Sequence, residues 1–388
     1  MMNTNETTRY RLKDILVIVN GKDHSSLDDG EYPVLGSGGI MRYANSYLYD
    51  GESVLLPRKG TLNNIQFIKG KFWTVDTCYY TKINNAIVNP YYLYRYLRSL
   101  DLSGLDSGAS IPSMTSKCYY GIKIRIPDIC IQQKIANILS RYDEAIENNN
   151  KRIKLLEQMA QNLYKEWFVR FRFPGYKKCE FENGIPKGWK VEKLENFGIV
   201  LESGSRPSGG VDINLEEGIP SLGAECIKGF AEFDYSNIKY IPLEFYEKMK
   251  RGKNKGNHIL LYKDGAYIGK VTLFRNQFPF KKYAINEHVF FLNSKNDNYL
   301  NWLFFTLRQD SYFNLMQNLN RNAAQPGLSQ PDINRIKIRI PSEDVVIKFN
   351  EFVEPIFNIV FDLAKANKNL SKQRDLLLPR LMSGKLEA

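Results

Sequence analysis

The chain of 388 residues is longer than one hydrophobic core usually supports, so the sequence predicts two or more domains. Hydrophobic residues make up 43% and charged residues 25%, which excludes a globally disordered chain, and no apolar run approaches the length of a membrane helix. The net charge of +12 fits a polyanionic partner, most often nucleic acid, as well as a merely basic soluble protein.

The cysteines and the N-terminus indicate a cellular compartment. The five cysteines are scattered, odd in number and never in a C-x-x-C spacing, which suits a reducing cytosol and predicts no structural zinc. The first residues are polar and lack the core of a signal peptide. We therefore expect a cytoplasmic protein.

Residues 10–128 predict a mixed, strand-rich domain. The stretches "SVLLP" and "FWTVDTCYY" are β-branched and aromatic, as strands are, whereas "GEYPVLGSGGIMRY" alternates turn residues with short apolar runs. In "NPYYLYRYLRSL", Asn89 is placed to cap a helix that starts at Pro90.

From Ile131 the pattern becomes that of one long helix. No Gly or Pro interrupts it until Pro174, so we expect roughly 40 residues and a length of about 60 Å. An apolar stripe on so long a helix predicts a coiled-coil seam. Asn149 on this seam is either a register-setting polar residue or an exposed residue at a weak heptad. The predicted packing residues are Ile135, Ile138, Tyr142, Ile146, Ile153, Leu156 and Leu163.

A second globular part follows a Gly-, Pro- and Lys-rich crossing loop at residues 174–189. Its strand candidates are "HILLY", "AYIGKVTLF" and "EHVFFL", and "NYLNWLFFTLRQDSYFNLMQ" predicts a helix. A second long apolar stripe then begins near Phe349, and Pro355 should kink this helix or mark its start. The predicted packing residues are Phe352, Ile356, Ile359, Leu363, Leu370 and Leu377.

The hexapeptide "IKIRIP" occurs at residues 122–127 and again at 336–341, 214 positions later (336 − 122). Its flanks also match: "GASIPSMTS" aligns with "NAAQPGLSQ", so that Thr115 meets Ser329, and upstream "LLPRKG" resembles "LLYKDG". Each copy predicts an exit strand with buried isoleucines and solvated basic residues, followed by a long helix. The chain is therefore a duplicated unit rather than a solenoid.

These elements predict an α+β fold. Two mixed α/β domains, residues 1–128 and 173–342, are joined by two long helices, residues 129–172 and 343–388. Since neither seam has another partner in the chain, we expect the helices to pack on each other. Packed antiparallel, they form a coiled coil with a pseudo-two-fold axis between the repeats.

Sequence signatures of catalysis are weak. "NPYY" lacks the second proline of the N-P-P-Y/F element of amino-methyltransferases, and "GAYIGKV" is too short for a phosphate-binding loop. The histidines His24, His258 and His288 are isolated, with no metal-ligand spacing. We therefore expect a protein that recognises rather than catalyses.

Basic and polar loops on both repeats are candidates for DNA contact, because Arg and Lys neutralise phosphates and Arg, Lys, Asn, Gln, Ser and Thr read base edges. A solvated surface loop is the alternative for each one alone. In the first repeat the candidates are Ser37, Arg42, Arg58, Lys59, Thr61, Asn63 and Lys117. In the second repeat they are Ser205, Arg206, Ser208, Lys250, Arg251, Lys253, Lys270, Arg321, Asn322 and Gln325.

In this order, the elements resemble the specificity (S) subunit of type I restriction–modification systems over nearly the whole chain. The resemblance rests on "YPVLGSGGIMRY", "GESVLLPRKGTLNNI" and "QPGLS", and on two helical segments that look like the family's conserved regions, "LLEQMAQNLYKEWFVRF" and "LSKQRDLLLPRLMSGKLEA". It implies a non-catalytic subunit whose target recognition domains read a bipartite DNA target, with the helices fixing the spacing. Unlike loops in the two repeats predict unlike half-sites and an asymmetric target.

The resemblance also implies partners: two methyltransferase subunits, contacted around residues 148–168 and 369–386, and motor/nuclease subunits. S-adenosylmethionine, ATP and Mg²⁺ are then expected in those partners, with no cofactor or metal bound by this chain. The alternatives are a stand-alone bipartite DNA-binding regulator, which would bind its site without partners, and a methyltransferase, which would bind S-adenosylmethionine itself.

Overall fold

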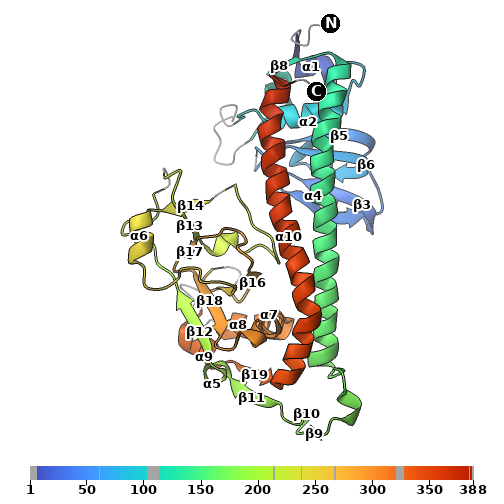
Figure 1. The fold of residues 1–388 in the computed structure, drawn as a ribbon. Helices are drawn as coiled ribbons and strands as arrows, with labels where there is room; N and C mark the ends of the chain where they lie inside the picture. The colour runs from blue at the N-terminus through green and yellow to red at the C-terminus, as the bar shows by residue number, and fades with distance from the viewer. Residues whose placement is uncertain are drawn as a thin grey trace. The chain divides into compact units, whose positions relative to one another are not determined.

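The computed structural model describes residues 7–60, 62–102, 113–212, 215–236, 238–265, 268–319, 327–383 and 385–386. The chain divides into two compact units. Unit 1 comprises Met1–Ile146 with Asn369–Ala388, and unit 2 comprises Glu147–Lys368. Two long helices, α4 (Ile129–Tyr164) and α10 (Glu343–Met382), contribute residues to both units (Figure 1).

Unit 1 is built on a six-stranded sheet in the order β2-β7-β5-β6-β3-β4. Neighbouring strands are antiparallel except for the parallel pair β3 and β6. The predicted strand "FWTVDTCYY" is divided between β6 and β7 by a turn. The strands are β2 (Leu16–Asn20), β3 (Asp29–Gly36), β4 (Gly39–Ala44), β5 (Tyr49–Pro57), β6 (Gln66–Thr74) and β7 (Cys78–Ile83).

Helix α2 (Pro90–Arg98) lies against β5 and β6 and closes the core of unit 1. The predicted cap is confirmed, because the Asn89 side chain accepts a hydrogen bond from Tyr92 N–H at 2.9 Å. The aromatic face of α2 meets the sheet through Tyr91 and Tyr94, whose rings pack against Phe67.

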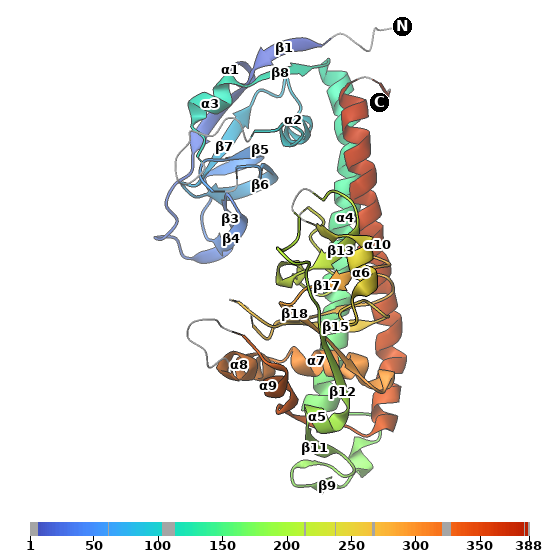
Figure 2. The same ribbon diagram turned by 90° about the vertical axis from the view of Figure 1, so that its left-hand side faces the viewer.

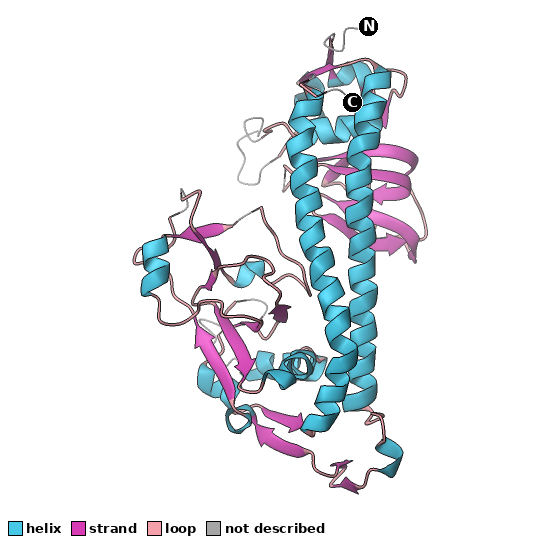
Figure 3. Ribbon diagram, viewed as in Figure 1, coloured by secondary structure: helices cyan, strands magenta, loops and turns pink. Residues whose placement is uncertain are grey.

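Unit 2 has smaller sheets. The largest has the order β12-β18-β15-β16, and a second has the order β14-β13-β17. Figure 3 draws the strands in magenta and the helices in cyan. The predicted crossing loop contains a short hairpin of β9 and β10. The strands are β9 (Phe181–Glu182), β10 (Ile185–Pro186), β12 (Ile199–Ser203), β13 (Ile219–Leu222), β14 (Lys239–Ile241), β15 (His258–Tyr262), β16 (Val271–Phe274), β17 (Ala284–Ile285) and β18 (Val289–Ser294).

Helix α7 of unit 2 is buried along its whole length, between the sheet and the long helices. The single helix expected from Asn298 to Gln317 breaks at Arg308–Gln309 and becomes α7 and α8. The α-helices of this globular part are α5 (Leu194–Phe197), α6 (Leu243–Lys248), α7 (Leu300–Leu307), α8 (Asp310–Leu319) and α9 (Gln330–Asn334).

Both copies of "IKIRIP" form the strand that leaves each globular part, as predicted. In unit 1, β8 (Lys123–Ile126) pairs antiparallel with β1 (Thr8–Arg11) (Figure 2). In unit 2, β19 (Lys337–Ile340) pairs antiparallel with β11 (Lys190–Lys193). Both strands alternate exposed basic residues with buried isoleucines, which is the pattern of a strand with one solvated face.

The duplication extends to the helices beside these strands. Thr115 caps α3 (Ser116–Gly121) by accepting a hydrogen bond from Cys118 N–H. Ser329 caps α9 in the same way, accepting from Asp332 N–H. The two capping residues are the ones that the sequence repeat aligns.

The short helices after the entry strands also match. In unit 1, α1 (Leu12–Ile15) follows β1, and Leu12 N–H donates to the Ile122 carbonyl oxygen at 3.0 Å. In unit 2, α5 follows β11, and Leu194 N–H donates to the Ile336 carbonyl oxygen at 2.9 Å. The repeated sequence thus folds with repeated hydrogen bonds.

The long helices pack antiparallel within each unit. Helix α4 has 36 residues and continues into a π-helical turn at Lys165–Val169, whereas α10 has 40 residues. In unit 2, Asn149 Nδ2 donates to Asn367 Oδ1 at 2.9 Å, and the Tyr164 ring packs against Phe349. Asn149 therefore has a polar partner across the helix pair, as a register-setting residue requires.

In unit 1, an ion network joins the two long helices to α2. Arg374 of α10 pairs with Asp143 of α4, and buried Arg95 of α2 lies between Asp143 and Asp375. Burial opposes the charge of Arg374, but the hydrogen bonds that its guanidinium donates to Asp375 and Asp143 raise its pKa above the usual value. The network holds α2 against both helices.

The predicted seam of α10 is wrong at Ile359, which is 45% exposed, whereas Ile356, Leu363 and Leu377 are partly buried as expected. Phe352 is 55% exposed, but its ring packs edge-on against Trp167 in the continuation of α4. The helix also continues through Pro355, which marks no start. The fully buried positions are Val346, Phe349, Val353, Phe357, Val360 and Phe361.

The error has a physical cause, because α10 packs on two partners in unit 2. Its apolar surface faces the sheet and α7 as well as α4, and the Phe357 ring packs against both Phe304 and Phe305 of α7. A seam drawn for a coiled coil alone follows only one edge of this wider apolar face. On α4, all seven predicted packing positions are buried or half-buried.

Within the described part of the chain, no helix is both long and apolar enough to cross a membrane.

Candidate nucleic-acid interface

The turn after β5 in unit 1 and the turn after β15 in unit 2 share one backbone arrangement. Arg58 N–H donates to the Thr77 carbonyl oxygen at 2.9 Å, and Lys263 N–H donates to the His288 carbonyl oxygen at 3.1 Å. Arg58 and Lys263 occupy the same position of "LLPRKG" and "LLYKDG". Thr77 and His288 each directly precede the neighbouring strand, β7 or β18. We call this arrangement the repeated turn.

The basic side chains of the repeated turn are held alike. Arg58 Nη1 donates to the carbonyl oxygen of Asp76 at 3.3 Å. Lys263 Nζ donates to the carbonyl oxygen of Glu287 at 3.2 Å. A cation is thus fixed at the same place on each unit.

A third segment completes the repeated turn. Met114 N–H donates to the Arg58 carbonyl oxygen at 3.0 Å, and Leu328 N–H donates to the Lys263 carbonyl oxygen at 2.8 Å. An isolated β-bridge lies beside each of these bonds, Lys59 with Ser113 and Asp264 with Gly327. The loops before α3 and α9 are therefore tied to the turn in both units.

The residue after each bridge residue is a glycine, because the backbone there takes a conformation that other residues rarely adopt. Gly60 has φ +86° and Gly265 has φ +96°, in the left-handed region. A side chain at Gly60 would also place its Cβ 3.3 Å from Ser37 Oγ. The β3–β4 turn therefore lies directly against the repeated turn of unit 1.

The structure brings most of the predicted unit-1 candidates together around this turn. Ser37 is tied to the loop, since Asn64 Nδ2 donates to its carbonyl oxygen at 2.7 Å. Lys59 and Asn63 are exposed on the loop. Lys117 is exposed on α3, which follows the bridge residue Ser113.

Two unit-1 candidates stand apart from this group. Arg42 is on β4 and is held by the Asp29 carboxylate at 3.0 Å and by the Leu27 carbonyl oxygen at 2.8 Å. These partners occupy Nη2 of its guanidinium, which makes Arg42 a weaker candidate than Arg58. Thr61 lies outside the described residues.

In unit 2, six of the candidates lie on two loops that approach each other closely. A Cβ on Gly252 would lie 2.5 Å from the Gly204 Cα. The loop after β12 carries the exposed residues Ser205, Arg206 and Ser208, and the loop after α6 carries Lys250, Arg251 and Lys253.

Two of these cations already have partners within the unit. Arg206 Nε pairs with Glu287 Oε1 at 2.7 Å. Lys253 Nζ donates to the Glu247 carbonyl oxygen at 2.9 Å and lies over the Tyr246 ring. Lys250 and Arg251 are exposed, and Lys270 is half-buried just before β16. Arg321, Asn322 and Gln325 lie outside the described residues.

Sequence reasoning did not select Lys263, Asp264 or His288. His288 Nδ1 lies 3.0 Å from Asp264 Oδ2, so the two form a polar pair at the surface of unit 2. The alignment of "PRKG" with "YKDG" already matched Lys263 with Arg58 and Asp264 with Lys59. His288 was invisible in the repeat, because only the strand pairing aligns it with Thr77.

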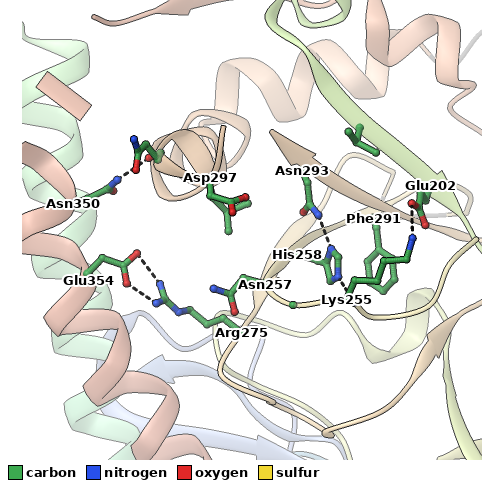
Figure 4. A pocket seen from close by; sticks show the side chains of 14 residues that line it. Glu202, Lys255, Asn257, His258, Arg275, Phe291, Asn293, Asp297, Asn350 and Glu354 are labelled. Carbon is green, nitrogen blue, oxygen red and sulfur yellow. Dashed lines mark hydrogen bonds and ion pairs between the residues drawn. The ribbon is translucent and has the colours of Figure 1, made fainter. Parts of the chain in front are cut away.

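Unit 2 also contains a polar cavity of about 640 Å³ between its sheet and α10 (Figure 4). Arg275, which is 5% exposed in its side chain, pairs with Glu354 of α10 across the cavity. Burial opposes the Glu354 charge, but hydrogen bonds from Arg275 and Asn301 keep the pKa of this carboxyl below its usual value. These contacts attach the sheet and α7 to α10.

His258 lines the same cavity. Burial lowers the pKa of its imidazole, and the ring stacks on Phe291. Its Nε2 accepts from Lys255 N–H at 2.9 Å, which leaves Nδ1 to face the Asn293 carboxamide at 2.7 Å. Within the described ranges, no three His, Cys, Asp or Glu side chains gather as metal ligands would.

Comparison with known proteins identifies the class. A family model described as the type I restriction modification DNA specificity domain matches residues 5–158 and 186–371. The interface thus belongs to a DNA-recognition protein. The chain is a member of the specificity-subunit family of type I restriction–modification systems, in which it is the non-catalytic, DNA-recognising component.

Individual relatives agree. The chain is 31% identical over 305 residues to the type I restriction enzyme MjaIX specificity subunit of Methanocaldococcus jannaschii, covering 76% of this chain and 68% of the relative. It is 24% identical over 397 residues to the MjaVIII specificity subunit of the same organism, covering 97% and 92%. A crystal structure of a type I restriction–modification S subunit from M. genitalium shares the fold, with a TM-score of 0.60 and 15% identity over 98% and 97% of the two chains.

Proposed function

We propose that this specificity subunit reads a bipartite, asymmetric DNA target, with one half-site read by each globular part. The observation that carries the proposal is the repeated turn, which presents a fixed cation, Arg58 or Lys263, beside basic and polar loops in each unit. Cations position a protein on phosphates, and the neighbouring polar side chains are suited to base edges.

The asymmetry follows from the side chains around the turn. Unit 1 offers Ser37, Lys59 and Asn63, whereas unit 2 offers Asp264 and His288. Different donors and acceptors select different bases. A shared backbone with unlike side chains therefore supports two unlike half-sites.

The direct experiment is a methylation map of a genome that carries the subunit with its cognate methyltransferase subunit. We expect one motif made of two unlike half-sites separated by unread base pairs. A single continuous palindrome would overturn the proposal.

A binding assay separates this function from that of a stand-alone regulator. We expect specific, salt-sensitive binding to the mapped motif only when methyltransferase subunits are present. Tight specific binding by the isolated chain would favour the regulator instead.

We further propose that the helix pair of unit 2 docks a methyltransferase subunit. Leu155 and Met159 on α4 are 60% and 57% exposed, and Phe352 and Ile359 on α10 are exposed as well. At about 100° per residue, Leu155 and Met159 lie on the side of α4 opposite Glu157, which pairs with Arg308 at the C-terminal end of α7. These four residues form an apolar strip.

The docking proposal is tested by co-purification with the methyltransferase subunit. The variant Leu155→Glu/Met159→Glu should lose at least tenfold in affinity, because each carboxylate would be buried unpaired in an apolar interface. Leu243→Glu, on α6, is the matched control because Leu243 is 50% exposed away from the long helices. Equal binding by both variants would contradict docking at this strip.

We propose that motor/nuclease subunits join this assembly and that cofactor chemistry resides in the partners: S-adenosylmethionine in the methyltransferase subunits, and ATP with Mg²⁺ in the motor/nuclease subunits. Calorimetric titration of the isolated chain with S-adenosylmethionine should show no binding. Measurable binding would instead revive a methyltransferase function.

A further inference from the structure

The two units place opposite charges at one equivalent position. Lys59 of unit 1 and Asp264 of unit 2 both follow the fixed cation and precede a left-handed glycine. Each also forms an isolated β-bridge, to the loop before α3 in unit 1 and to the loop before α9 in unit 2. The bonds made by the Arg58 and Lys263 backbones match in the two units, whereas the side chains that follow them carry opposite charges.

The neighbouring position changes with it. Thr77 in unit 1 corresponds to His288 in unit 2, because the carbonyl oxygen of each accepts a hydrogen bond from the backbone N–H of Arg58 or Lys263. His288 Nδ1 contacts Asp264 Oδ2 at 3.0 Å, and its Nε2 lies 3.4 Å from Glu287 Oε1. The His288 imidazole therefore holds the Asp264 carboxylate, whereas the equivalent residue in unit 1 is a threonine.

A carboxylate here is unsuited to the phosphate backbone, which repels it. The Asp264 side chain is 31% exposed, so it remains accessible, and Arg206 lies close by through its ion pair with Glu287, the residue before His288. A carboxylate in a basic DNA-facing surface is favourable where it accepts a hydrogen bond from a base, and the cytosine amino group is the major-groove donor that Asp and Glu pair with. Lysine, a donor only, pairs instead with the O6 and N7 acceptors of guanine.

We propose that position 59/264 determines base specificity in each unit: Lys59 selects guanine in the half-site of unit 1, and Asp264 selects cytosine in the half-site of unit 2. His288 is a positioning residue that orients the Asp264 carboxylate. The inference rests on the proposed function, because it requires each unit to read its own half-site.

The experiment maps the methylated motif of the complete complex carrying wild type, Asp264→Lys or Lys59→Asp. Asp264→Lys should replace one cytosine of the second half-site by guanine and lower methylation of the original motif by roughly tenfold or more. Lys59→Asp should make the reverse change in the first half-site. Each variant should leave the other half-site as in wild type.

A smaller variant keeps the test decisive if an exchanged charge disturbs folding. Asp264→Ala removes the acceptor without adding a cation and should relax the second half-site at that same base pair. Targets that carry any of the four bases at this position should then be methylated to within about fivefold of one another. His288→Asn should weaken this discrimination without replacing the preferred base.

Three results would overturn the inference. They are an unchanged motif in Asp264→Ala, a change confined to overall methylation with every base preference kept, and a change in the first half-site. A wild-type motif without separate half-sites would instead refute the proposed function, so the two failures are distinguishable.

Discussion

Units 1 and 2 share the backbone hydrogen bonds of the repeated turn but carry different side chains on it. The repeated turn keeps its hydrogen bonds to within a few tenths of an ångström, while the residue after the fixed cation is Lys59 in one unit and Asp264 in the other. By contrast, the ion pairs that attach each globular part to the long helices start from different elements: a buried arginine on α2 in unit 1 and a buried arginine after β16 in unit 2. The duplication has preserved the support of the candidate reading surface and has varied the chemistry placed on it.

The attachment to the helices offers the largest expected effect. Unit 1 uses Arg95 between Asp143 and Asp375, and unit 2 uses Arg275 with Glu354. Arg275→Ala removes a nearly buried cation and leaves the carboxylate beside it unpaired, so we expect a loss of about 3 kcal/mol in the free energy of unfolding, below the range for fully buried pairs because Glu354 is partly exposed.

Arg95→Ala should lower stability by a similar amount, and hydrogen exchange should show the loss in unit 1 rather than in unit 2. Urea unfolding measures the free energy lost by each variant, and hydrogen exchange shows in which unit it is lost. The exposed pair of Lys151 and Glu147 supplies a control, because Lys151→Ala should change stability by less than about 1 kcal/mol. Equal losses in the control and the two variants would show that the buried pairs carry no special weight.

The glycines of the repeated turn come next. Gly60→Ala and Gly265→Ala each force a side chain into the left-handed region, which costs about 1–2 kcal/mol. Since the turn is repeated, the two variants should lose similar amounts, measured by thermal unfolding. Gly121→Ala is the control, because Gly121 has an ordinary φ and open space around its Cα.

The helix caps sharpen the comparison further. Thr115→Ala and Ser329→Ala remove matched capping oxygens and should each cost about 1 kcal/mol. Thr115→Ser and Ser329→Thr keep the oxygen and should restore most of that stability. If only one of the two alanine variants is destabilised, the caps are not equivalent.

The smallest effect is expected from pH. The folded-state pKa of Glu354 is lowered, so its contribution is present above the unfolded pKa near 4.5 and is lost as pH falls through the folded value. Glu354→Gln should therefore flatten the decline in stability of unit 2 below pH 4.5 relative to wild type. Thermal unfolding between neutral pH and that range measures it, and an unchanged slope would contradict the assignment.

The sequence predicted the elements governed by local chemistry. "IKIRIP", the Asn89 cap and the first helical stripe follow from alternation, capping and periodicity, each of which acts over a few residues. Ile359 was misplaced because the face that α10 turns to α7 depends on a segment far away in sequence. The pairing of Asp264 with His288 was hidden for the same reason, since two strands of one sheet bring the residues together.

Among the candidate site residues, the sequence selected Arg58 and Lys59 by their charge in a Gly-containing loop, but it passed over Lys263, whose side chain is held in the same way. Arg58 and Lys59 are two adjacent cations and mark a basic loop, whereas the charge of Lys263 is offset by Asp264 next to it. The alignment of the repeats already matched the two positions, and the shared hydrogen bonds show that their side chains are held alike.

The central claim is that the two units read two half-sites independently, and paired methylation maps of Arg58→Ala and Lys263→Ala test it most directly. We expect Arg58→Ala to weaken discrimination in one half-site only and Lys263→Ala to weaken it in the other only, each by about 1–3 kcal/mol per affected base pair. Loss of discrimination in the same half-site, or in both half-sites equally, would contradict this account.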